Sequence, residues 1–366
     1  MRRTTRKIVA NVILFWTALL LVLSFNHDWR STTKTFAWTT IHYKTTSTAL
    51  PEPRGICPGL EDSSKPALVV ARVDAEDRTW LKALAALYHL CVYTADVKDV
   101  TSTALQVPAN RGHEAMAYLT FLIDNYEYLP AAGAVFVHGS RWAWHNDDPD
   151  YDNAALLTAL NISAALAPSG YHNLRCDWSA STCSPSEAPA QGSLETLARS
   201  VLEPWNIRAA SDRALGGAFA SLFGGDGLNA NPGSASLLLG RTDAVRSQCC
   251  AQFVVSRERM RQHSRAEYIA LRQWLLDEGS RAAPPDDRIA GRILSYVWHI
   301  LFMQQGESHV DLERLNSLAC PRADECYCRL YGRCNLEGCT SPGHCRGQYV
   351  LPPHFRLPDD WAARHS

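Results

Sequence analysis

The sequence lacks the short motifs that identify several large classes of enzyme. It has no glycine-rich phosphate loop, no His-Glu-x-x-His zinc motif and no Gly-x-Ser-x-Gly nucleophile elbow. Residues 225–230 fit the dinucleotide pattern G-x-G-x-x-A on paper, but they follow a helical stretch, whereas that motif requires a preceding strand. These chemistries therefore have little support.

The chain also lacks a substantial net charge and any concentrated basic stripe beyond its N-terminus. Its 36 Lys and Arg nearly balance 37 Asp and Glu, and the formal net charge is -1. A nucleic-acid-binding protein presents a basic surface, so we expect no nucleic acid as the main partner. Hydrophobic residues make up 46% of the chain and charged residues 20%, which is typical of a folded protein and not of a disordered one.

An apolar run at residues 8–25 predicts a membrane anchor. Only Asn11, Thr17 and Ser24 interrupt it. As a helix it is about 27 Å long, at the short end of what spans a bilayer. Basic residues precede the run, so the positive-inside rule leaves the N-terminus in the cytosol. We expect a single-pass type II protein of the Golgi or ER with a lumenal C-terminal part, and a cleaved signal peptide is the alternative.

Composition divides the chain into five parts. Residues 26–65 are rich in Ser and Thr, which indicates a solvated stem that cannot bury a core. The last fifth is rich in cysteine. The predicted division is a cytosolic tail at residues 1–7, an anchor at 8–25, a stem at 26–65, a lumenal α/β domain at 66–310 and a disulfide-rich extension at 311–366.

The 12 cysteines predict disulfides, because an even number in an oxidising lumen favours pairing. Six of them follow the spacing C-x5-C-x-C-x5-C-x4-C-x5-C from Cys320, which has no C-x-x-C pair and disfavours a zinc ribbon. Six cysteines allow about 15 pairings, so the connectivity stays open. Cys176 and Cys183 could close a loop neck. A disulfide between the adjacent Cys249 and Cys250 would be strained, so we expect each to pair elsewhere or stay buried.

Apolar patterns along residues 66–310 predict an α/β fold with a mainly parallel sheet and helices on both faces. Compact apolar runs at residues 67–72, 91–95 and 134–139 indicate strands. Helical spacing at residues 78–90 and 110–128 indicates the helices between them, so the order suggests right-handed βαβ units.

The second half of the domain is predicted to add one late strand and further helices. The strand is expected within residues 247–256, with Ser256 as the N-cap of the following helix, and helices at residues 153–167 and 286–304. The only glycosylation sequon, Asn161-Ile-Ser, lies within the first of these helices and is usable if this side is lumenal.

Acidic and aromatic side chains gather after the apolar run at residues 134–139. In open α/β sheets ligands bind at the carboxyl ends of strands. Four carboxylates within six residues can hold a hard divalent cation, and Asp148 and Asp150 are the predicted ligands of Mn²⁺ or Mg²⁺. The alternative is that Asn, Asp and Pro build a turn here and that Asp152 caps the next helix.

Further ligand contacts are predicted around this cluster. Trp and Arg can stack on or pair with a ligand, and His145 is either a ligand or base, or a hydrogen-bonded structural histidine. The residues after the first strand face a ligand or form a solvated acidic loop. Asp286 and Asp287 could supply a general base or cap the helix that follows. The predicted ligand-binding residues are Arg72, Glu76, Asp77, Trp142, Trp144, His145 and Asp147.

Several segments between residues 66 and 335 resemble one fungal family of membrane-anchored proteins, the domain of unknown function (DUF) 3431 family. The segments are VVARVDAEDRTWL, NRGHEAMAYLTFLIDNYEYLP, FVHGSRWAWHNDDPDYDN, GYHNLRC, CCAQFVVSRERM, GRILSYVWHILF and CPRADECYCRLYGRC. The layout is similar to that of A-type glycosyltransferases, an analogy of architecture and not of chemistry. Ser295, and Val73 to Ala75, stand where this resemblance leads us to expect other residue types.

The analogy yields a functional hypothesis. A-type enzymes place a D-x-D pair after a strand, where a divalent ion neutralises the leaving diphosphate, and residues 148–152 contain two such patterns. We expect a metal-assisted glycosyltransferase that uses a nucleotide-sugar and a glycan acceptor, with no catalytic residue assigned and the oligomeric state open. A non-catalytic lumenal glycan- or protein-binding protein is one alternative, and Ser295 favours it. A metal-dependent lumenal hydrolase is another.

Overall fold

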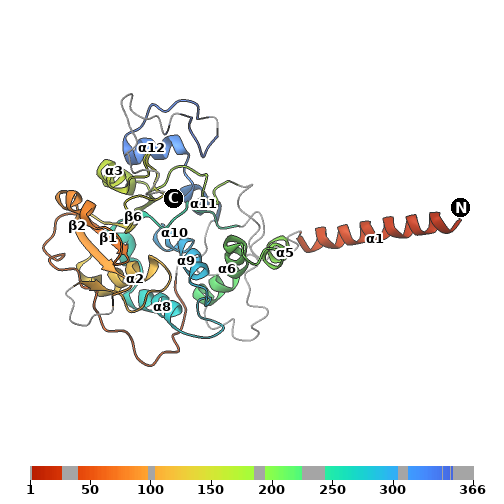
Figure 1. The fold of residues 1–366 in the computed structure, drawn as a ribbon, viewed down its shortest axis with the longest axis horizontal. Coiled ribbons are helices and arrows are strands. Elements are labelled where there is room, and N and C mark those ends of the chain that lie inside the picture. The colour runs from red at the N-terminus through yellow and green to blue at the C-terminus, as the bar shows by residue number, and fades with distance from the viewer. Residues whose placement is uncertain are drawn as a thin grey trace.

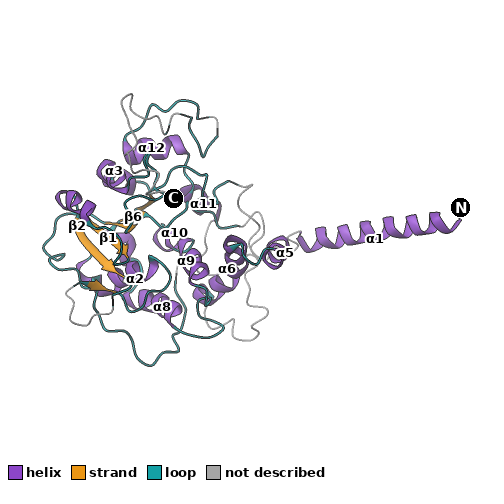
Figure 2. Cartoon of the chain, in the orientation of Figure 1, coloured by secondary structure: helices purple, strands orange, loops and turns teal. Residues whose placement is uncertain are grey.

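A six-stranded sheet forms the centre of the molecule (Figures 1 and 2). The structure is a computed structural model, and it describes residues 2–26, 40–97, 104–184, 194–224, 244–303, 312–339, 341–346 and 348. The strand order is β3-β2-β1-β4-β6-β5. The strands are β1 (Ala67–Arg72), β2 (His89–Thr94), β3 (Leu105–Gln106), β4 (Ala134–His138), β5 (Tyr171–Asn173) and β6 (Phe253–Val255).

The sheet is mixed, which corrects the expectation of a mainly parallel one. Strands β2, β1 and β4 run parallel, as the βαβ spacing predicted, and the short β3, which was not predicted, is parallel to β2. Strand β6 is antiparallel to both β4 and β5. An apolar run shows that a strand is buried but not in which direction it runs, so the sequence pattern did not reveal this reversal.

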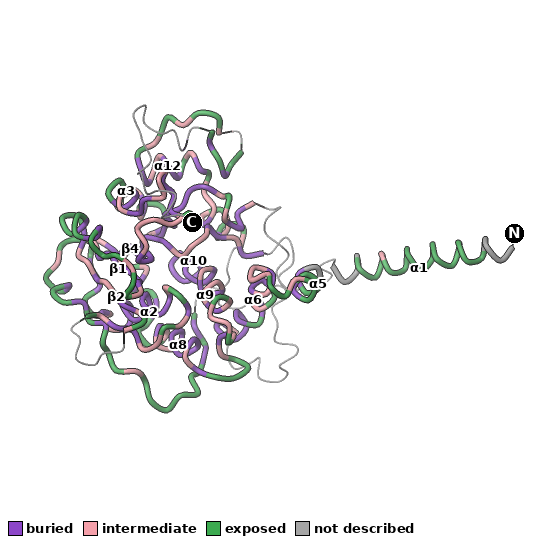
Figure 3. The backbone as a smooth tube through the Cα atoms, viewed as in Figure 1, coloured by how far each residue is buried: buried purple, intermediate pink, exposed green. Residues whose placement is uncertain are grey.

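Helices cover both faces of the sheet, as expected. All six residues of β1 are buried, and alternate ones belong to different cores. Ala67, Val69 and Ala71 pack with one helical layer, whereas Leu68 and Val70 pack with the other. The first layer contains α2 (Ala115–Asp124), α6 (Ile207–Phe223), α8 (Arg265–Leu276), α9 (Asp287–Ser295) and α10 (Trp298–Phe302). The second contains η1 (Thr79–Ala86), α3 (Asn153–Ala159), α4 (Ile162–Leu166) and α12 (Ala323–Tyr331). Figure 3 shows the buried chain concentrated between these layers.

Several predicted helices are divided by internal caps. The expected helix at residues 153–167 breaks before Asn161, whose side chain accepts a hydrogen bond from Ala164 N. Ser256 caps α7 (Arg257–Arg261) as predicted, and Ser264 then caps α8 through a capping box with Glu267. The other elements are η2 (Tyr126–Tyr128), α5 (Leu194–Leu202) and α11 (Leu312–Ala319). The glycine-rich pattern at residues 225–230 lies outside the described residues.

The N-terminal helix α1 (Arg2–Asn26) contains the apolar run predicted to be an anchor. Within the part of the chain that the structure describes, no helix combines the length and the apolar character needed to cross a membrane, in contrast to the expected span at residues 8–25.

Part of the expected stem packs against the domain. Residues 27–39 lie outside the described residues, but Ile41, Tyr43 and Leu60 are buried. The Tyr43 hydroxyl donates to Asp277, and Cys57 forms a disulfide with Cys91 of β2. The Ser/Thr-rich composition concealed these scattered apolar anchors, whereas most other residues between 40 and 65 are exposed.

Six disulfides join all 12 cysteines. Cys176 pairs with Cys326 and Cys183 with Cys320, so these two cysteines do not close a loop neck between them. Both bonds tie the C-terminal segment to the residues that follow β5. The adjacent Cys249 and Cys250 form a disulfide with each other, which corrects the expectation that they pair elsewhere or stay unpaired.

Candidate functional site

The carboxyl ends of the parallel strands gather the loops that surround the candidate site. Strand β4 ends at His138, and its Phe136 lies opposite Phe253, the first residue of the antiparallel β6. Strand β5 ends at Asn173, also opposite Phe253. The residues before β6 therefore meet the residues after β4 and β5 at one edge of the sheet, which is the edge where α/β folds bind ligands.

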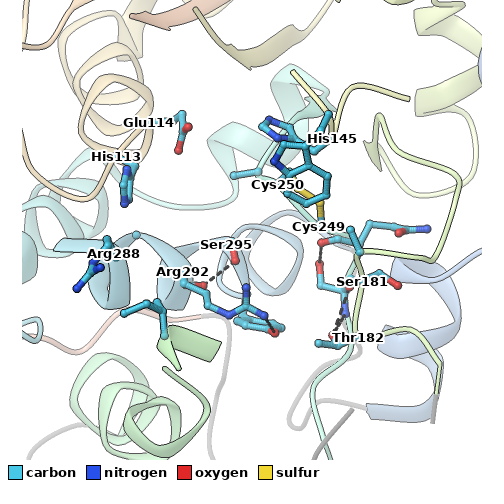
Figure 4. Close-up of a pocket in the computed structure, with 18 residues that line it drawn as sticks. His113, Glu114, His145, Ser181, Thr182, Cys249, Cys250, Arg288, Arg292 and Ser295 are labelled. Carbon is cyan, nitrogen blue, oxygen red and sulfur yellow. Dashed lines mark hydrogen bonds between the residues drawn. A yellow bond between two sulfur atoms is a disulfide. The ribbon is translucent and has the colours of Figure 1, made fainter. Parts of the chain in front are cut away.

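A cavity of about 320 Å³ lies at this edge (Figure 4). Its lining combines residues from the start of α2, the loop after β4, the segment after β5, the segment before β6, and α9. In Figure 4, His113 and Glu114 stand on one side, and His145, Cys249 and Cys250 stand on the other. The cavity is lined by His113, Glu114, Trp144, His145, Ala180, Ser181, Thr182, Ile207, Ser247, Gln248, Cys249, Cys250, Ala251, Arg288, Gly291, Arg292, Ser295 and Tyr296.

Two of the predicted ligand-binding residues, Trp144 and His145, line this cavity. The Trp144 side chain is 63% exposed, which is unusual for so large an apolar group and leaves the indole available for stacking. The His145 ring packs edge-on against His138, with 4.7 Å between the ring centroids. Burial, together with the neighbouring His138 and Arg175, lowers the pKa of His145 to about 3, so the ring is neutral at pH 7.

Asn146 holds the loop that carries Trp144. Its side-chain amide donates to the carbonyls of Arg141 at 3.0 Å and Tyr151 at 2.8 Å. Its side-chain oxygen lies 2.9 Å from His138 Nε2 and accepts from Gln252 Nε2 at 3.0 Å. One buried amide thus joins the loop after β4 to the segment before β6, and no sequence motif pointed to it.

The carboxylates of the Asp cluster point to separate partners. Asp147 is buried and accepts from the N–H groups of Cys176 and Asp177 and from the Tyr327 hydroxyl. Asp152 caps α3 and forms a two-point hydrogen-bonded pair with Arg141. These two side chains fix the loop to its surroundings, which agrees with the turn and cap alternative.

Asp148 is buried within the turn of the same loop. It accepts from Asp150 N at 3.1 Å and lies 3.8 Å from the Arg333 guanidinium. Burial raises the pKa of Asp148 because the charged carboxylate is partly desolvated. Neither Asp148 nor Asp150 lines the cavity. Among the described residues, the one group of three potential metal ligands is Cys57, His89 and Cys91, and its two cysteines are already joined in a disulfide.

The residues after β1 organise their own loop. The buried Arg72 guanidinium donates to Thr94 and to the carbonyls of Asp74 and Glu76. Glu76 accepts from Val73 N at 3.0 Å and from the Ser140 hydroxyl at 2.5 Å, so this loop and the loop after β4 do meet. Gly139 permits the close approach, because a β-carbon there would overlap the Arg72 side chain.

Two further predicted residues lie beside that contact and outside the cavity lining. The exposed Asp77 accepts from the backbone and hydroxyl of Thr79, and these hydrogen bonds lower its pKa. Trp142 lies under the Arg141 guanidinium, 4.5 Å from the ring centroid. Asp286 caps α9, which fits the capping alternative, whereas Asp287 accepts from Gly112 N and ties α9 to the segment before α2.

Comparison with models of protein families assigns the chain to one family. A family model described as a protein of unknown function (DUF3431) matches residues 68–329, well over half of the sequence. The chain belongs to the DUF3431 family. Neither the curated proteins nor the solved structures that were compared contain a match to it. The matched range includes every residue of the sheet except Ala67, and every residue that lines the cavity.

The DUF3431 cavity also contains functional groups that sequence reasoning missed. Glu114 is the one carboxylate in its lining, and Arg292 from α9 presents a guanidinium whose Nη2 donates to the Tyr296 hydroxyl. A positive φ of 52° at His113 turns the chain just before Glu114, and Gly291 makes room for that imidazole on α9. No local pattern marks these residues, because they come from the starts or faces of ordinary helices.

A buried histidine links the cavity to the loop after β1. Burial lowers the pKa of His138, the last residue of β4. The carboxylates of Glu114, which lines the cavity, and of Glu76, in the loop after β1, act in the opposite direction. Ser295, singled out in the sequence as a departure from the expected residue type, does line the cavity of this DUF3431 protein. Asn161 is exposed at the start of α4, away from the cavity lining, so its position does not prevent glycosylation.

Proposed function

We propose that this protein binds a nucleotide-linked sugar in the cavity at the carboxyl edge of the sheet and transfers the sugar to a glycan or glycoprotein. The observation that carries the proposal is the composition of the lining. An exposed indole, a carboxylate and a guanidinium border a volume of about 320 Å³, which is at the small end of ligand-binding clefts and suits a hexose-sized group.

Each of the three groups has a role that its chemistry supports. Trp144 offers an aromatic face to the apolar C–H face of a sugar ring. Glu114 is the group in a position to accept the proton of an acceptor hydroxyl, as a general base does. Arg292 lines the cavity, and its guanidinium, whose Nη2 donates to the Tyr296 hydroxyl, has further N–H groups that can donate to a phosphate oxygen.

A divalent ion, Mn²⁺ or Mg²⁺, is part of this proposal. Asp148 and Asp150, which lie outside the cavity lining, would hold it, and because two carboxylates are too few for six-coordination, water and the oxygens of a diphosphate that extends beyond the cavity would complete the set. Burial raises the pKa of Asp148 despite the nearby Arg333, and a bound cation would counteract this effect by stabilising the charged carboxylate. When bound, the ion would neutralise charge on the leaving diphosphate.

The disulfides support an oxidising compartment as the place of action. Paired cysteines are rare in the reducing cytosol, whereas all 12 cysteines of this chain are paired. We infer a lumenal protein of the ER or Golgi with a glycan on Asn161. In such a compartment, the donor substrates would be nucleotide-sugars and the acceptor substrates would be glycoproteins.

Replacement of Trp144 tests the proposed binding site. Calorimetry with uridine and guanosine diphosphate-hexoses, with and without Mn²⁺, should show an affinity at least about tenfold lower for Trp144→Ala than for the wild type. Trp205→Ala is the matched control, because Trp205 is 75% exposed and lies outside the cavity lining. If the wild-type protein neither binds nor hydrolyses nor transfers from any of these donors, the proposal is wrong.

A non-catalytic lumenal carbohydrate-binding protein is the second candidate. Two observations favour it: Asp147 and Asp152 are engaged in structural hydrogen bonds, and Ser295 occupies the lining in place of an expected acid. Glu114→Gln separates the candidates. A transferase should keep donor affinity and lose turnover by a factor of about 100 or more. A binding protein shows no turnover in either form.

A further inference from the structure

The Cys249–Cys250 disulfide differs in kind from the other five. They join cysteines that are 6 to 150 positions apart, whereas this one joins immediate neighbours. A disulfide stabilises a fold mainly by closing a loop in the unfolded chain, and a bond between neighbours closes almost none. Loop closure therefore does not account for its presence.

The position of this disulfide points to a ligand. Both cysteines line the cavity, and Figure 4 shows them beside His145, across the cavity from His113 and Glu114. The backbone turns sharply at this point, because Cys250 has a φ of 82° and Ala251 a φ of 46°. The joined side chains form one compact apolar part of the cavity wall.

Hydrogen bonds connect the segment that carries the disulfide to the loop that carries Trp144. Gln252, two residues after Cys250, donates to Asn146, and Asn146 fixes the loop that carries Trp144. Asn173 Nδ2 in turn donates to the carbonyl of Cys249. The disulfide and Trp144 thus belong to one hydrogen-bonded unit.

We propose that the Cys249–Cys250 disulfide is a ligand-contacting surface that works with Trp144 to hold the ring of a hexose. Divalent sulfur is polarisable and packs well against aromatic and C–H groups, while Glu114 and Arg292 on other sides of the cavity reach hydroxyl or phosphate oxygens. The inference rests on the proposed function, since it names the part of the cavity that selects the sugar over the nucleotide.

Two disulfide-free variants test this inference. Cys249→Ala/Cys250→Ala removes the sulfur atoms, and Cys249→Ala/Cys250→Gly does the same while accommodating the positive φ at residue 250. The control is Cys328→Ala/Cys334→Ala, which removes another short-range disulfide whose cysteines lie outside the lining. Thermal melting identifies which variants are folded, and the second cavity variant serves if the first is not.

Calorimetry with uridine and guanosine diphosphate-hexoses, and with the free nucleotides, measures the effect. We expect both cavity variants to bind the nucleotide-hexoses roughly tenfold more weakly, with the control and the free-nucleotide affinities unchanged. Equal affinities of wild type and folded cavity variants, together with a loss in Trp144→Ala, would overturn this inference and leave the proposed function intact. Absence of binding to the wild type would overturn both.

Discussion

Three histidines have ring pKa values well below the usual value for histidine. Burial lowers the pKa of His299 to about 3 and that of His172 to about 4, and burial with neighbouring charges lowers that of His145 to about 3. All three are neutral in the folded chain at pH 7, but each titrates near pH 6.5 when the chain unfolds. The unfolded state therefore binds more protons below pH 6.5, and stability falls as the pH is lowered through this range.

His299 gives the clearest test of this pH dependence, because neither ring nitrogen has a hydrogen-bond partner among the described residues. As the pH falls from 7.5 to 5.5, one such histidine should lower the free energy of unfolding by about 1.4 kcal/mol. Guanidinium chloride unfolding measures the decrease in the free energy of unfolding over this pH range. In His299→Leu and in His299→Gln this decrease should be smaller than in the wild type by about the same amount. Agreement between the two variants separates protonation from packing, and a wild-type pH profile in both would contradict the assignment.

At the residue scale, sequence reasoning found one wall of the cavity and missed the others. Trp144 and His145 were identified because they follow an apolar run that ends in glycine, which is a local signal. Glu114 and Arg292 reach the cavity only through tertiary packing, so no local spacing distinguishes them from other helix residues. Asp147 was selected because its acidic neighbours resemble a metal site, and its carboxylate accepts a hydrogen bond from the backbone after β5, a contact that local sequence does not show.

At the scale of elements, the parallel half of the sheet was predictable because its strands are uninterrupted apolar runs joined by helical spacing. Strand β5 has only three residues, too few to show a period, and the direction of β6 depends on long-range pairing. Interruptions within helices were equally hidden, because a cap such as Asn161 is recognised by its hydrogen bonds and fits a helical pattern in the sequence.

Asn161 combines a capping role with a glycosylation sequon, and two substitutions separate these roles. Asn161→Asp removes the glycan acceptor but preserves a capping oxygen for Ala164 N, so its stability should match that of enzymatically deglycosylated wild type. Asn161→Ala should lower the free energy of unfolding by about a further 1 kcal/mol. Protein secreted from a eukaryotic host should show an endoglycosidase-sensitive mobility shift that both variants lack. A wild-type chain without that shift would show that the sequon is unused.

At the scale of the whole molecule, the C-terminal segment is part of the folded domain and not an appendage. Helix α12 contributes Tyr327 and Leu330 to the core that covers one face of the sheet. The bonds Cys176–Cys326 and Cys183–Cys320 span 150 and 137 positions and lie close together at both ends. The even cysteine count predicted disulfides but not this pairing, because partners so far apart leave no local pattern.

These two bonds should stabilise the fold redundantly. While one is intact, the other closes a ring of only about 15 residues, and its removal should cost about 3 kcal/mol. Once both are removed, the unfolded chain also gains the freedom of a loop longer than 100 residues, which adds about 5 kcal/mol. Two variants each remove one bond: Cys176→Ala/Cys326→Ala and Cys183→Ala/Cys320→Ala. The loss of unfolding free energy in the variant with all four cysteines replaced by Ala should therefore exceed the sum of the losses in these two paired variants.

Chemical unfolding of the wild type, the two paired variants and the quadruple variant measures this coupling directly. Cys328→Ala/Cys334→Ala serves as the control, because its cysteines are six positions apart and enclose neither long-range bond. The loss of unfolding free energy in this control should simply add to the loss in either paired variant when the substitutions are combined. Simple additivity of the two long-range bonds would mean that they constrain separate parts of the unfolded chain, which their nested positions in the sequence do not allow.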